Sequence, residues 1–282
     1  MTPTEIVLAV FGVLGAFAVG SFLCVVIERM PVLLDEPDRF GDLYGMRPWG
    51  EVLGGSSRCS GCGADIRPYD KIPTISWLVL RGKCRTCGDR IPGFHPLVEL
   101  AVPAISVGLV LALGWGWRSV PALWLVPVGV AVAAIDFRVF MVPTRIVWPA
   151  FFVSLALSGV AVAVENQPRW LLGGIVGLLA FAGPLFLIWF ALPGGMGFGD
   201  VRLATLLGWT VGFTAIDGSW MTALFVAITA LLGAAFVGII LSIIGVTARG
   251  RHAKVPFAPS MILSVLLCIA FAEELIAGFE IV

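Results

Sequence analysis

Long stretches without a single charged residue constrain this sequence more than any other feature. Residues 6–27 form an uncharged run of 22, residues 170–199 a run of 30 and residues 218–248 a run of 31. Apolar runs of about 18 residues or more are long enough to cross a bilayer as helices. Only 13% of the residues are charged, which is about half the usual fraction in a soluble domain. The sequence therefore predicts an all-α polytopic membrane protein.

Shorter apolar segments bring the predicted number of transmembrane helices to about eight. The predicted spans cover residues 6–27, 100–117, 119–136, 146–164, 170–192, 201–216, 220–246 and 257–276. The first span exceeds the apolar part of a typical secretory signal, and no basic residue precedes it, so we expect it to be retained. Residues 218–248 admit a second interpretation, in which one span is joined to a re-entrant piece.

Basic residues indicate how these spans are oriented. If eight spans alternate in direction, 16 of the 18 Lys and Arg residues fall on one side of the membrane. The loops on that side cover residues 28–98, 137–145, 193–202 and 247–256. Because basic loops stay in the cytosol, we predict that this side is cytosolic and that both termini face outward. The net charge is zero, which gives no reason to expect nucleic-acid binding.

Four cysteines in the first cytosolic loop predict a structural zinc site. They form two Cys-x2-Cys pairs with 21 residues between them, and their members are Cys59, Cys62, Cys84 and Cys87. Two such pairs can close a tetrahedral thiolate site, which leaves no open position for catalysis. Two disulfides are the alternative, but a reducing cytosol disfavours them. The predicted domains are therefore a first transmembrane helix (1–27), a small cytosolic zinc-knuckle loop domain (28–98) and a transmembrane core (99–282).

Two aspartates lie where predicted spans meet the cytosol. Asp200 follows the glycine-rich stretch 194–199, and Asp136 ends the third predicted span. A carboxylate at such a border is costly to keep ionised, so it is a functional candidate. Gly197 and Gly199 let the backbone come close to another chain, which suits them to position a substrate. Structural interpretations also exist, since Asp200 could cap the following helix and Asp136 could simply mark the end of its span.

Two carboxyl groups at one membrane depth make an acid–base pair for peptide hydrolysis conceivable. One carboxylate would activate a water, while the other, protonated, would polarise the carbonyl and protonate the leaving amine. A multi-span transporter or scaffold is the alternative, since transporters also combine broken, glycine-rich helices with buried acids. Transport sites lie near the bilayer midplane, whereas Asp136 and Asp200 lie at its predicted cytosolic edge. Glu99, at the border of the second predicted span, is given no catalytic role.

Several stretches together resemble the prepilin peptidase family, the type IV leader peptidases of the bacterial inner membrane. Gly197-x-Gly199-Asp200 is similar to the catalytic motif of that family, and Asp136 with Pro143 seven residues later is similar to its first catalytic aspartate. Together the similar stretches are residues 20–31, 57–101, 133–144, 194–208 and 255–260. The set includes the cysteine pairs and extends over nearly the whole chain.

This resemblance implies a membrane aspartic endopeptidase with Asp136 and Asp200 as its catalytic residues. Its substrates would be prepilin and pseudopilin precursors of type IV pili or type II secretion, cut on the cytosolic side after a short basic leader that ends in glycine. Many members also methylate the new N-terminus, which makes S-adenosylmethionine a candidate cofactor beside zinc. The implied location is the bacterial cytoplasmic (inner) membrane, where membrane lipids surround the spans.

Overall fold

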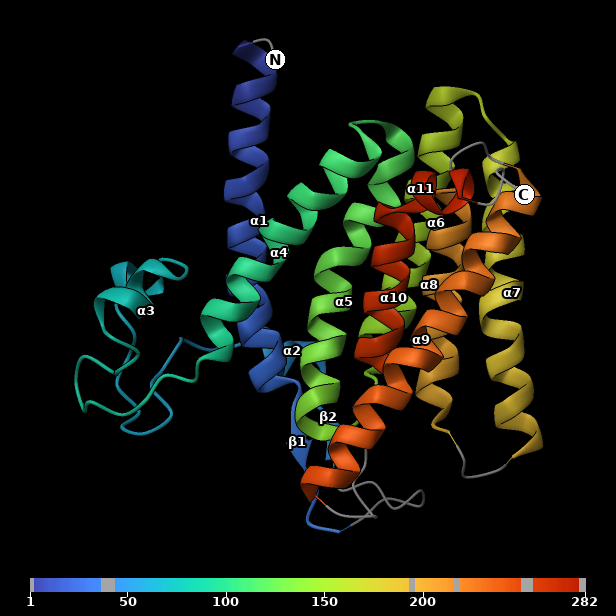
Figure 1. Ribbon diagram of the computed structural model, residues 1–282. Coiled ribbons are helices and arrows are strands. Elements are labelled where there is room, and N and C mark those ends of the chain that lie inside the picture. The colour runs from blue at the N-terminus through green and yellow to red at the C-terminus, as the bar shows by residue number, and fades with distance from the viewer. Residues whose placement is uncertain (1–2, 37–43, 193–195, 216–218, 250–255, 279–282) are drawn as a thin grey trace. The chain divides into compact units, whose positions relative to one another are not determined.

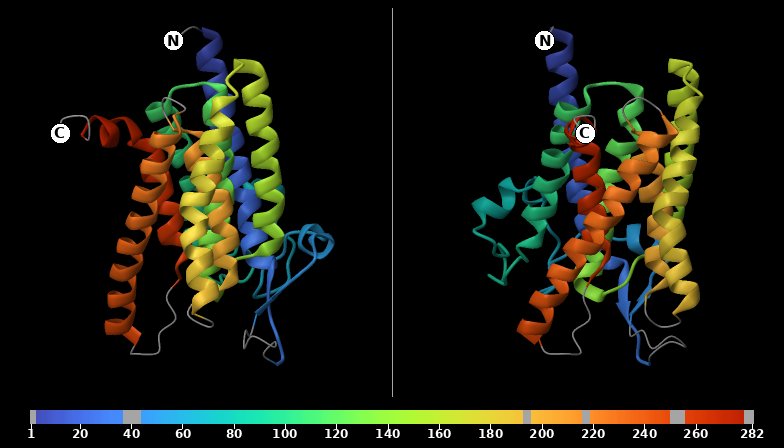
Figure 2. Two further views of the ribbon diagram at one scale, coloured as in Figure 1. Left: turned by 90° about the vertical axis from the view of Figure 1, so that its right-hand side faces the viewer. Right: turned by 45° about the vertical axis from the view of Figure 1, so that its right-hand side comes forward.

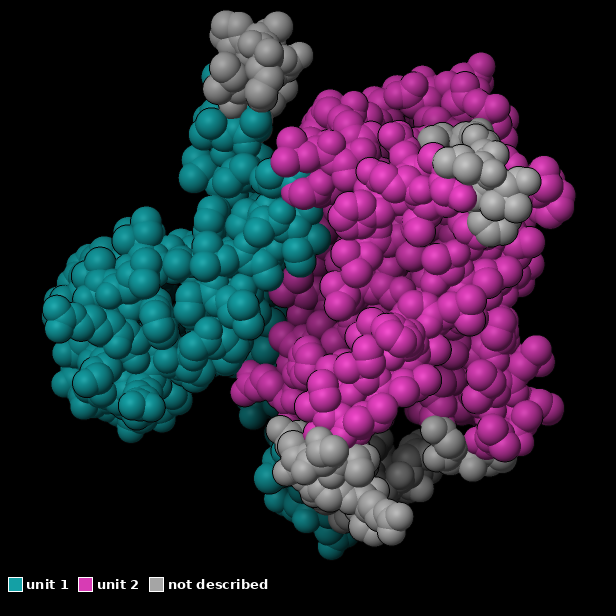
Figure 3. Space-filling model, viewed as in Figure 1, with its two compact units in different colours: residues 1–107 teal, residues 108–282 magenta. Residues whose placement is uncertain are grey.

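The computed structural model describes residues 3–36, 44–192, 196–215, 219–249 and 256–278. The chain divides into two compact units, residues 1–107 and residues 108–282 (Figure 3). Most of the regular structure in both units is helical (Figure 1). The helix α4 (Phe94–Leu113) begins in the first unit and ends in the second.

The first unit combines a long apolar helix with a small loop-rich region. Its elements before α4 are α1 (Pro3–Arg29), β1 (Pro31–Leu33), β2 (Tyr44–Met46), α2 (Trp49–Leu53), the 3-10 helix η1 (Pro68–Lys71) and α3 (Ile75–Val79). The helix α1 ends at Arg29, two residues before Pro31, whose nitrogen cannot donate a helical hydrogen bond. Pro31 instead begins the antiparallel pair β1–β2, in register with Met46.

The second unit is a helical bundle. Its elements after α4 are the 3-10 helix η2 (Trp117–Ser119), α5 (Val120–Val139), α6 (Thr144–Glu165), α7 (Arg169–Ala191), α8 (Phe198–Phe213), α9 (Trp220–Arg249), α10 (Ala258–Ala270) and α11 (Ala272–Ala277). The helices α5, α8 and α10 pack on one another. The left-handed Phe140 (φ 53°) ends α5, and its N–H donates to the backbone oxygen of Asp136 at 2.9 Å. The packing and the helix end together fix where the last turn of α5 lies.

Small residues let α7 and α8 approach closely, and the two helices lie side by side in Figure 2. A Cβ atom on Gly177 of α7 would lie 2.6 Å from the Cα atom of Gly212 on α8. A Cβ atom on Gly173 would likewise lie 2.6 Å from the carbonyl oxygen of Gly212. Such glycine contacts replace large side chains where membrane helices associate through close backbone packing. They hold α8, which carries Asp200, firmly against α7.

The predicted all-α polytopic fold is confirmed. Among the described residues, six helices are long and apolar enough to cross a membrane. They are α1, α4, α5, α6, α7 and α9. Two further predicted spans contain shorter helices, because α8 has 16 residues and α10 has 13. The predicted span 257–276 is interrupted at Phe271, after which α11 carries two glutamates in its first turn.

Candidate functional site: two aspartates and four cysteines

Asp200 lies in the first turn of α8. The N-cap of this helix is Gly197, so the interpretation that Asp200 caps it is wrong. The Phe198 ring packs against Trp189 of α7 with ring centroids 4.5 Å apart, and the guanidinium of Arg202 lies 4.6 Å from the centre of the same ring. Arg202 also donates to the hydroxyl of Thr144 at the start of α6. These contacts anchor the start of α8 to two neighbouring helices.

Asp136 occupies the last turn of α5 and is buried, with 4% of its surface exposed. The backbone N–H of Ala258, the first residue of α10, donates to its Oδ2 atom at 3.0 Å. A helix N-terminus presents unpaired N–H groups and a positive dipole end, which suits it to hold a carboxyl group. The start of α10 therefore orients the side chain of Asp136.

The structure brings together the helix ends that carry the two aspartates. The helices α5 and α8 pack on each other, and Gly199, next to Asp200, lies against Val142 in the segment that follows α5. Neighbouring carboxyl groups can share one proton, so that one serves as base and the other as acid. The arrangement can therefore supply both proton-transfer roles that hydrolysis of an amide needs.

The two glycines before Asp200 differ in their surroundings. A Cβ atom on Gly199 would lie 2.9 Å from the Cβ atom of Val142, in the segment that joins α5 to α6. A Cβ atom on Gly197 would meet nothing closer than Asp200 Oδ2, at 3.6 Å. Only Gly199 is therefore required for the close approach of α8 to this segment.

The four cysteines converge within the first unit. Their sulfur atoms all lie within 4.8 Å of one another, and the Sγ atoms of Cys59 and Cys87 are 3.8 Å apart. A regular tetrahedron with Zn–S bonds of about 2.3 Å places its sulfurs about 3.8 Å apart. All six cysteines of the chain are free thiols, so the structure gives no support to the disulfide alternative. The cysteine group fits a tetrahedral metal ion.

Each Cys-x2-Cys pair folds into the same kind of knuckle. In the first knuckle, Cys59 N–H donates to the Ala64 oxygen and Gly63 N–H donates to the Cys59 oxygen, both at 2.9 Å. Cys84 and Gly88 repeat this pattern in the second knuckle, at 2.7 and 2.9 Å. Gly63 and Gly88 both have positive φ (71° and 74°), which glycine adopts without strain. The repeated turn aims the sulfurs of both knuckles at one point.

An ion pair fastens the second knuckle to the rest of the loop region. Arg85 donates two hydrogen bonds to Asp70 of η1, from Nε at 3.0 Å and from Nη2 at 2.7 Å. These hydrogen bonds hold the pKa of Asp70 below its usual value. The 3-10 helix η1 is thereby joined to the knuckle that carries Cys84 and Cys87.

Two polar groups that received no role from the sequence are buried and hydrogen-bonded in the structure, namely the Ala258 amide and the Glu99 carboxyl group. The Ala258 amide gives no sequence signal, because every residue except proline carries the same donor. Glu99 carries the same signal as Asp200, an acid at the border of an apolar run, and it is buried with 7% exposed. That signal alone could have marked Glu99 as a candidate.

Comparisons with known proteins find similar sequences over most of the chain. Residues 13–113 match the bacterial peptidase A24 N-terminal domain, and residues 123–272 match the type IV leader peptidase family. A prepilin leader peptidase/N-methyltransferase of Aeromonas hydrophila is 31% identical over 93% of this chain and 90% of its own length. Proteins of the same name from Pseudomonas putida and Pseudomonas aeruginosa are 31% and 28% identical over 92% and 95% of this chain, and over 89% and 94% of their own lengths. No solved structure matches the chain.

Proposed function

Because the chain belongs to the type IV leader peptidase family, we propose that it is a membrane-embedded aspartic endopeptidase that removes the leader from prepilins or pseudopilins. The similar proteins named above are prepilin leader peptidases and N-methyltransferases, so methylation of the newly exposed N-terminus belongs to the same proposal. Nothing in these relatives favours a transporter or a scaffold. The observation that carries the proposal is the packing of α5, which ends with Asp136, against α8, which begins with Asp200.

Asp136 and Asp200 are the proposed catalytic residues. One carboxylate takes a proton from a water, and this water attacks the carbonyl carbon of the scissile peptide. The other carboxyl group, protonated, donates a hydrogen bond to the carbonyl oxygen and then transfers this one proton to the leaving amine as the C–N bond breaks, while the first keeps the proton taken from the water. The Ala258 amide holds Asp136 in place during these transfers, since it donates to the Oδ2 atom. Gly199 positions the backbone next to Asp200, whereas the open space around Gly197 gives no support to the positioning role predicted for it.

The four-cysteine group is proposed to hold a structural zinc ion. Four thiolates satisfy a tetrahedral zinc completely, so the ion would stabilise the knuckles without taking part in hydrolysis. The bound ion would then stabilise the fold of the loop region 57–91, as a hydrophobic core stabilises a larger domain.

The proposed location is the inner membrane, with the aspartates on its cytosolic side. Loops that carry 16 of the 18 Lys and Arg residues share that side, and basic loops resist translocation. Cleavage there suits a precursor whose basic leader has stayed in the cytosol. Precursor peptides and membrane lipids are the proposed partners.

A cleavage assay tests the proposal. The purified full-length protein in detergent is given a synthetic precursor peptide with a basic leader, and the products are identified by mass. Removal of a proton-transfer group costs about 10²–10⁴-fold, so Asp200→Asn should lose at least a hundredfold in rate. Glu165→Gln, at the exposed end of α6, is the matched control and should retain the wild-type rate. Wild-type cleavage by Asp200→Asn would contradict the assignment.

A further inference from the structure

The short helix α3 of the first unit presents an apolar face that the described part of the chain leaves exposed. Ile75, Leu78 and Val79 share one side of the helix, because residues three and four apart are neighbours on a helix surface. Ile72 precedes them and extends the same surface. These four residues, here called the α3 face, are 47% to 70% exposed. Contiguous exposed apolar surface of this kind marks a site of contact with a membrane or with another protein.

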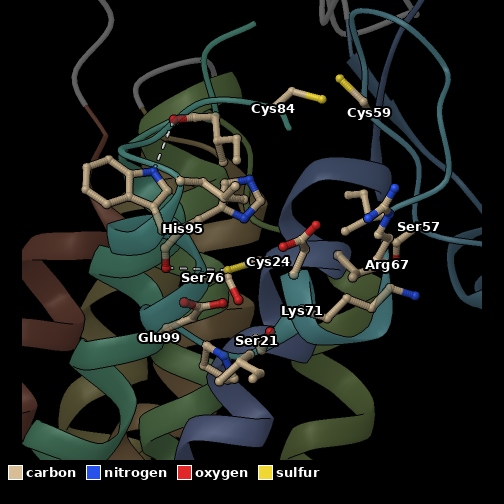
Figure 4. A pocket seen from close by; sticks show the side chains of 18 of the residues that line it. Ser21, Cys24, Ser57, Cys59, Arg67, Lys71, Ser76, Cys84, His95 and Glu99 are labelled. Carbon is tan, nitrogen blue, oxygen red and sulfur yellow. Dashed lines mark hydrogen bonds between the residues drawn. The ribbon is translucent and has the colours of Figure 1, made fainter. Parts of the chain in front are cut away.

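The other side of α3 is fixed against the loop region. The Ser76 hydroxyl donates to the Tyr69 oxygen at 2.9 Å, and the Trp77 indole N–H donates to the Ile91 oxygen at 3.2 Å. Ser76 and Trp77 line a cavity of about 670 Å³ that α1, the knuckle loops and the start of α4 enclose (Figure 4). The helix therefore cannot turn its apolar face inward without breaking these hydrogen bonds.

The turn that leads into α3 is held by Glu99 of α4. Thr74 has a φ of 58°, a left-handed conformation that is unfavourable for a β-branched residue. Its backbone N–H and its hydroxyl both donate to Oε2 of Glu99, which is buried. Strain of this kind persists only where the surrounding contacts over-determine the conformation. The carboxyl group of Glu99 thus fixes the start of α3 beside α4.

These contacts place α3 level with the apolar part of α1. The Glu99 backbone meets α1 at Gly20, where a Cβ atom would lie 2.9 Å from the Glu99 Cα atom. Gly20 lies about 14 Å along the helix from Arg29, the last residue of α1, at a rise of 1.5 Å per residue. Residues 9–29 form a candidate membrane span. Because the hydrocarbon core is about 30 Å thick, this level lies in the half of the bilayer nearer to Arg29.

The cysteine knuckles lie at a different level. In Figure 4, Ser76 and Glu99 lie near Ser21 of α1, whereas Cys59 and Cys84 lie at the far end of the cavity from Ser21. Figure 1 likewise shows α3 at the edge of the loop region that faces the N-terminal end of α1. The α3 helix is therefore the part of the loop region nearest to the middle of the bilayer.

Basic residues flank the α3 face. Residues 71–88 contain four basic residues and no acidic one. Lys71, Arg81 and Lys83 are exposed, while Arg85 pairs with Asp70. An apolar surface bordered by basic side chains is typical of segments that lie in the interface of membranes with anionic lipids.

From these observations we propose that the α3 face inserts into the cytosolic leaflet of the bilayer, with Lys71, Arg81 and Lys83 at anionic lipid headgroups. The loop region is then docked on the membrane at two places, through α1 and α4 and through α3. Glu99 acts as the positioning residue that presents α3 at this depth. The inference goes beyond the proposed peptidase activity and takes from that proposal only the membrane location.

A nitroxide label measures the depth of α3 in the full-length protein, reconstituted into vesicles of phosphatidylglycerol and phosphatidylcholine. A ketone-bearing unnatural amino acid replaces Val79 and carries the label, because a thiol label would react with the cysteines. Collisions with a polar nickel chelate should be about tenfold rarer than for the same label at Ser60, an exposed residue of the first knuckle, since hydrocarbon excludes polar solutes. Collisions with oxygen, which is apolar, should be more frequent at Val79 than at Ser60.

A charge in the α3 face should release it from the bilayer. With the label at Val79, Leu78→Glu should raise the chelate collisions to the value found at Ser60. Leu53→Glu is the matched control, because Leu53 is an exposed leucine of α2, a helix tied to Arg29 at the end of α1. It should leave the label shielded. Thermal unfolding confirms that each variant is folded.

Chelate collisions at Val79 that equal those at Ser60 in the otherwise unchanged protein would overturn the inference. So would exclusion of both the chelate and oxygen, because a protein surface, such as a second copy of the chain, would then cover the α3 face. Undiminished shielding in Leu78→Glu would contradict insertion of this face. Vesicles of phosphatidylcholine alone should shield the label less, and equal shielding there would refute the contact with anionic headgroups.

Precursor cleavage by the same vesicles separates this inference from the proposed function. Cleavage with a label at Val79 that stays in water would leave the peptidase proposal standing and overturn the docking. A shielded label in a protein that cleaves no precursor would support the docking and contradict the peptidase proposal.

Discussion

Replacing Gly199 with alanine should lower precursor cleavage about a hundredfold, although the change adds only one methyl group. The new Cβ atom would lie 2.9 Å from Val142 Cβ, whereas carbon atoms in good contact lie about 3.5–4.0 Å apart. The shortfall is therefore about 0.6–1.1 Å. Val142 cannot rotate its Cβ atom away, so the start of α8 must move by a comparable distance.

This movement reaches the proposed catalytic pair directly, because Asp200 is the next residue. A misplacement of about 1 Å in an active site can cost about 10²-fold in rate, or about 2.7 kcal/mol in the barrier. The same overpacking should reduce the free energy of unfolding by about 1–3 kcal/mol. The assay measures kcat/KM on a precursor peptide, together with the thermal midpoint of each variant.

Gly197→Ala is the matched control, two residues away in the same motif. Its Cβ atom has room, and the backbone angles at Gly197 (φ −70°, ψ 139°) suit alanine. We expect its rate to stay within about threefold of the wild type, since no displacement of Asp200 is required. Wild-type cleavage by Gly199→Ala would refute the packing argument. A larger loss in Gly197→Ala than in Gly199→Ala would refute it as well.

Two further predictions concern the helix contact and the metal. Gly177→Ala should lower the thermal midpoint of the full-length protein, because its Cβ atom would lie 2.6 Å from Gly212 Cα, whereas Gly183→Ala on the same helix meets open space and should not. Equal midpoints would contradict the tight α7–α8 contact. The purified protein should contain about one zinc per chain by elemental analysis, and Cys59→Ser combined with Cys84→Ser should remove it, since two thiolates hold zinc far more weakly than four. A wild type without metal would argue against a structural zinc ion.

The sequence predicts those features that repeat along the chain or depend on residue type. Uncharged runs predict the long helices, and two equally spaced cysteine pairs predict the convergence of their sulfurs. The pairing of Asp136 with Asp200 was inferred from charge and membrane depth, since both acids end or begin apolar segments on the basic side. The packing of α5 on α8 supports this pairing, and their catalytic role stays a prediction. The division into residues 1–27, 28–98 and 99–282 stays a prediction.

Other features depend on contacts between distant segments and could not be read from the chain. The Ala258 amide is a backbone group 122 residues from its acceptor, Asp136. The different surroundings of Gly197 and Gly199 depend on Val142, which lies in another loop. The helix of the last predicted span is interrupted at Phe271, after an apolar run that is long enough to resemble a full span. In the sequence, the two glutamates that follow were the signal that could have indicated this break. The cavity around Glu99 requires three segments to assemble, so its sequence signal was only an isolated acid.

A double-mutant cycle on the two aspartates tests the central claim most directly. Cleavage rates are measured for the wild type, Asp136→Asn, Asp200→Asn and the double variant on one precursor peptide, with thermal unfolding as a check on folding. Groups that act as a unit lose activity in a strongly non-additive way. The account predicts that each single variant loses at least a hundredfold and that the double variant loses no more than about threefold beyond the worse single variant. Losses that multiply, or a single variant that cleaves at the wild-type rate, would contradict a shared catalytic role.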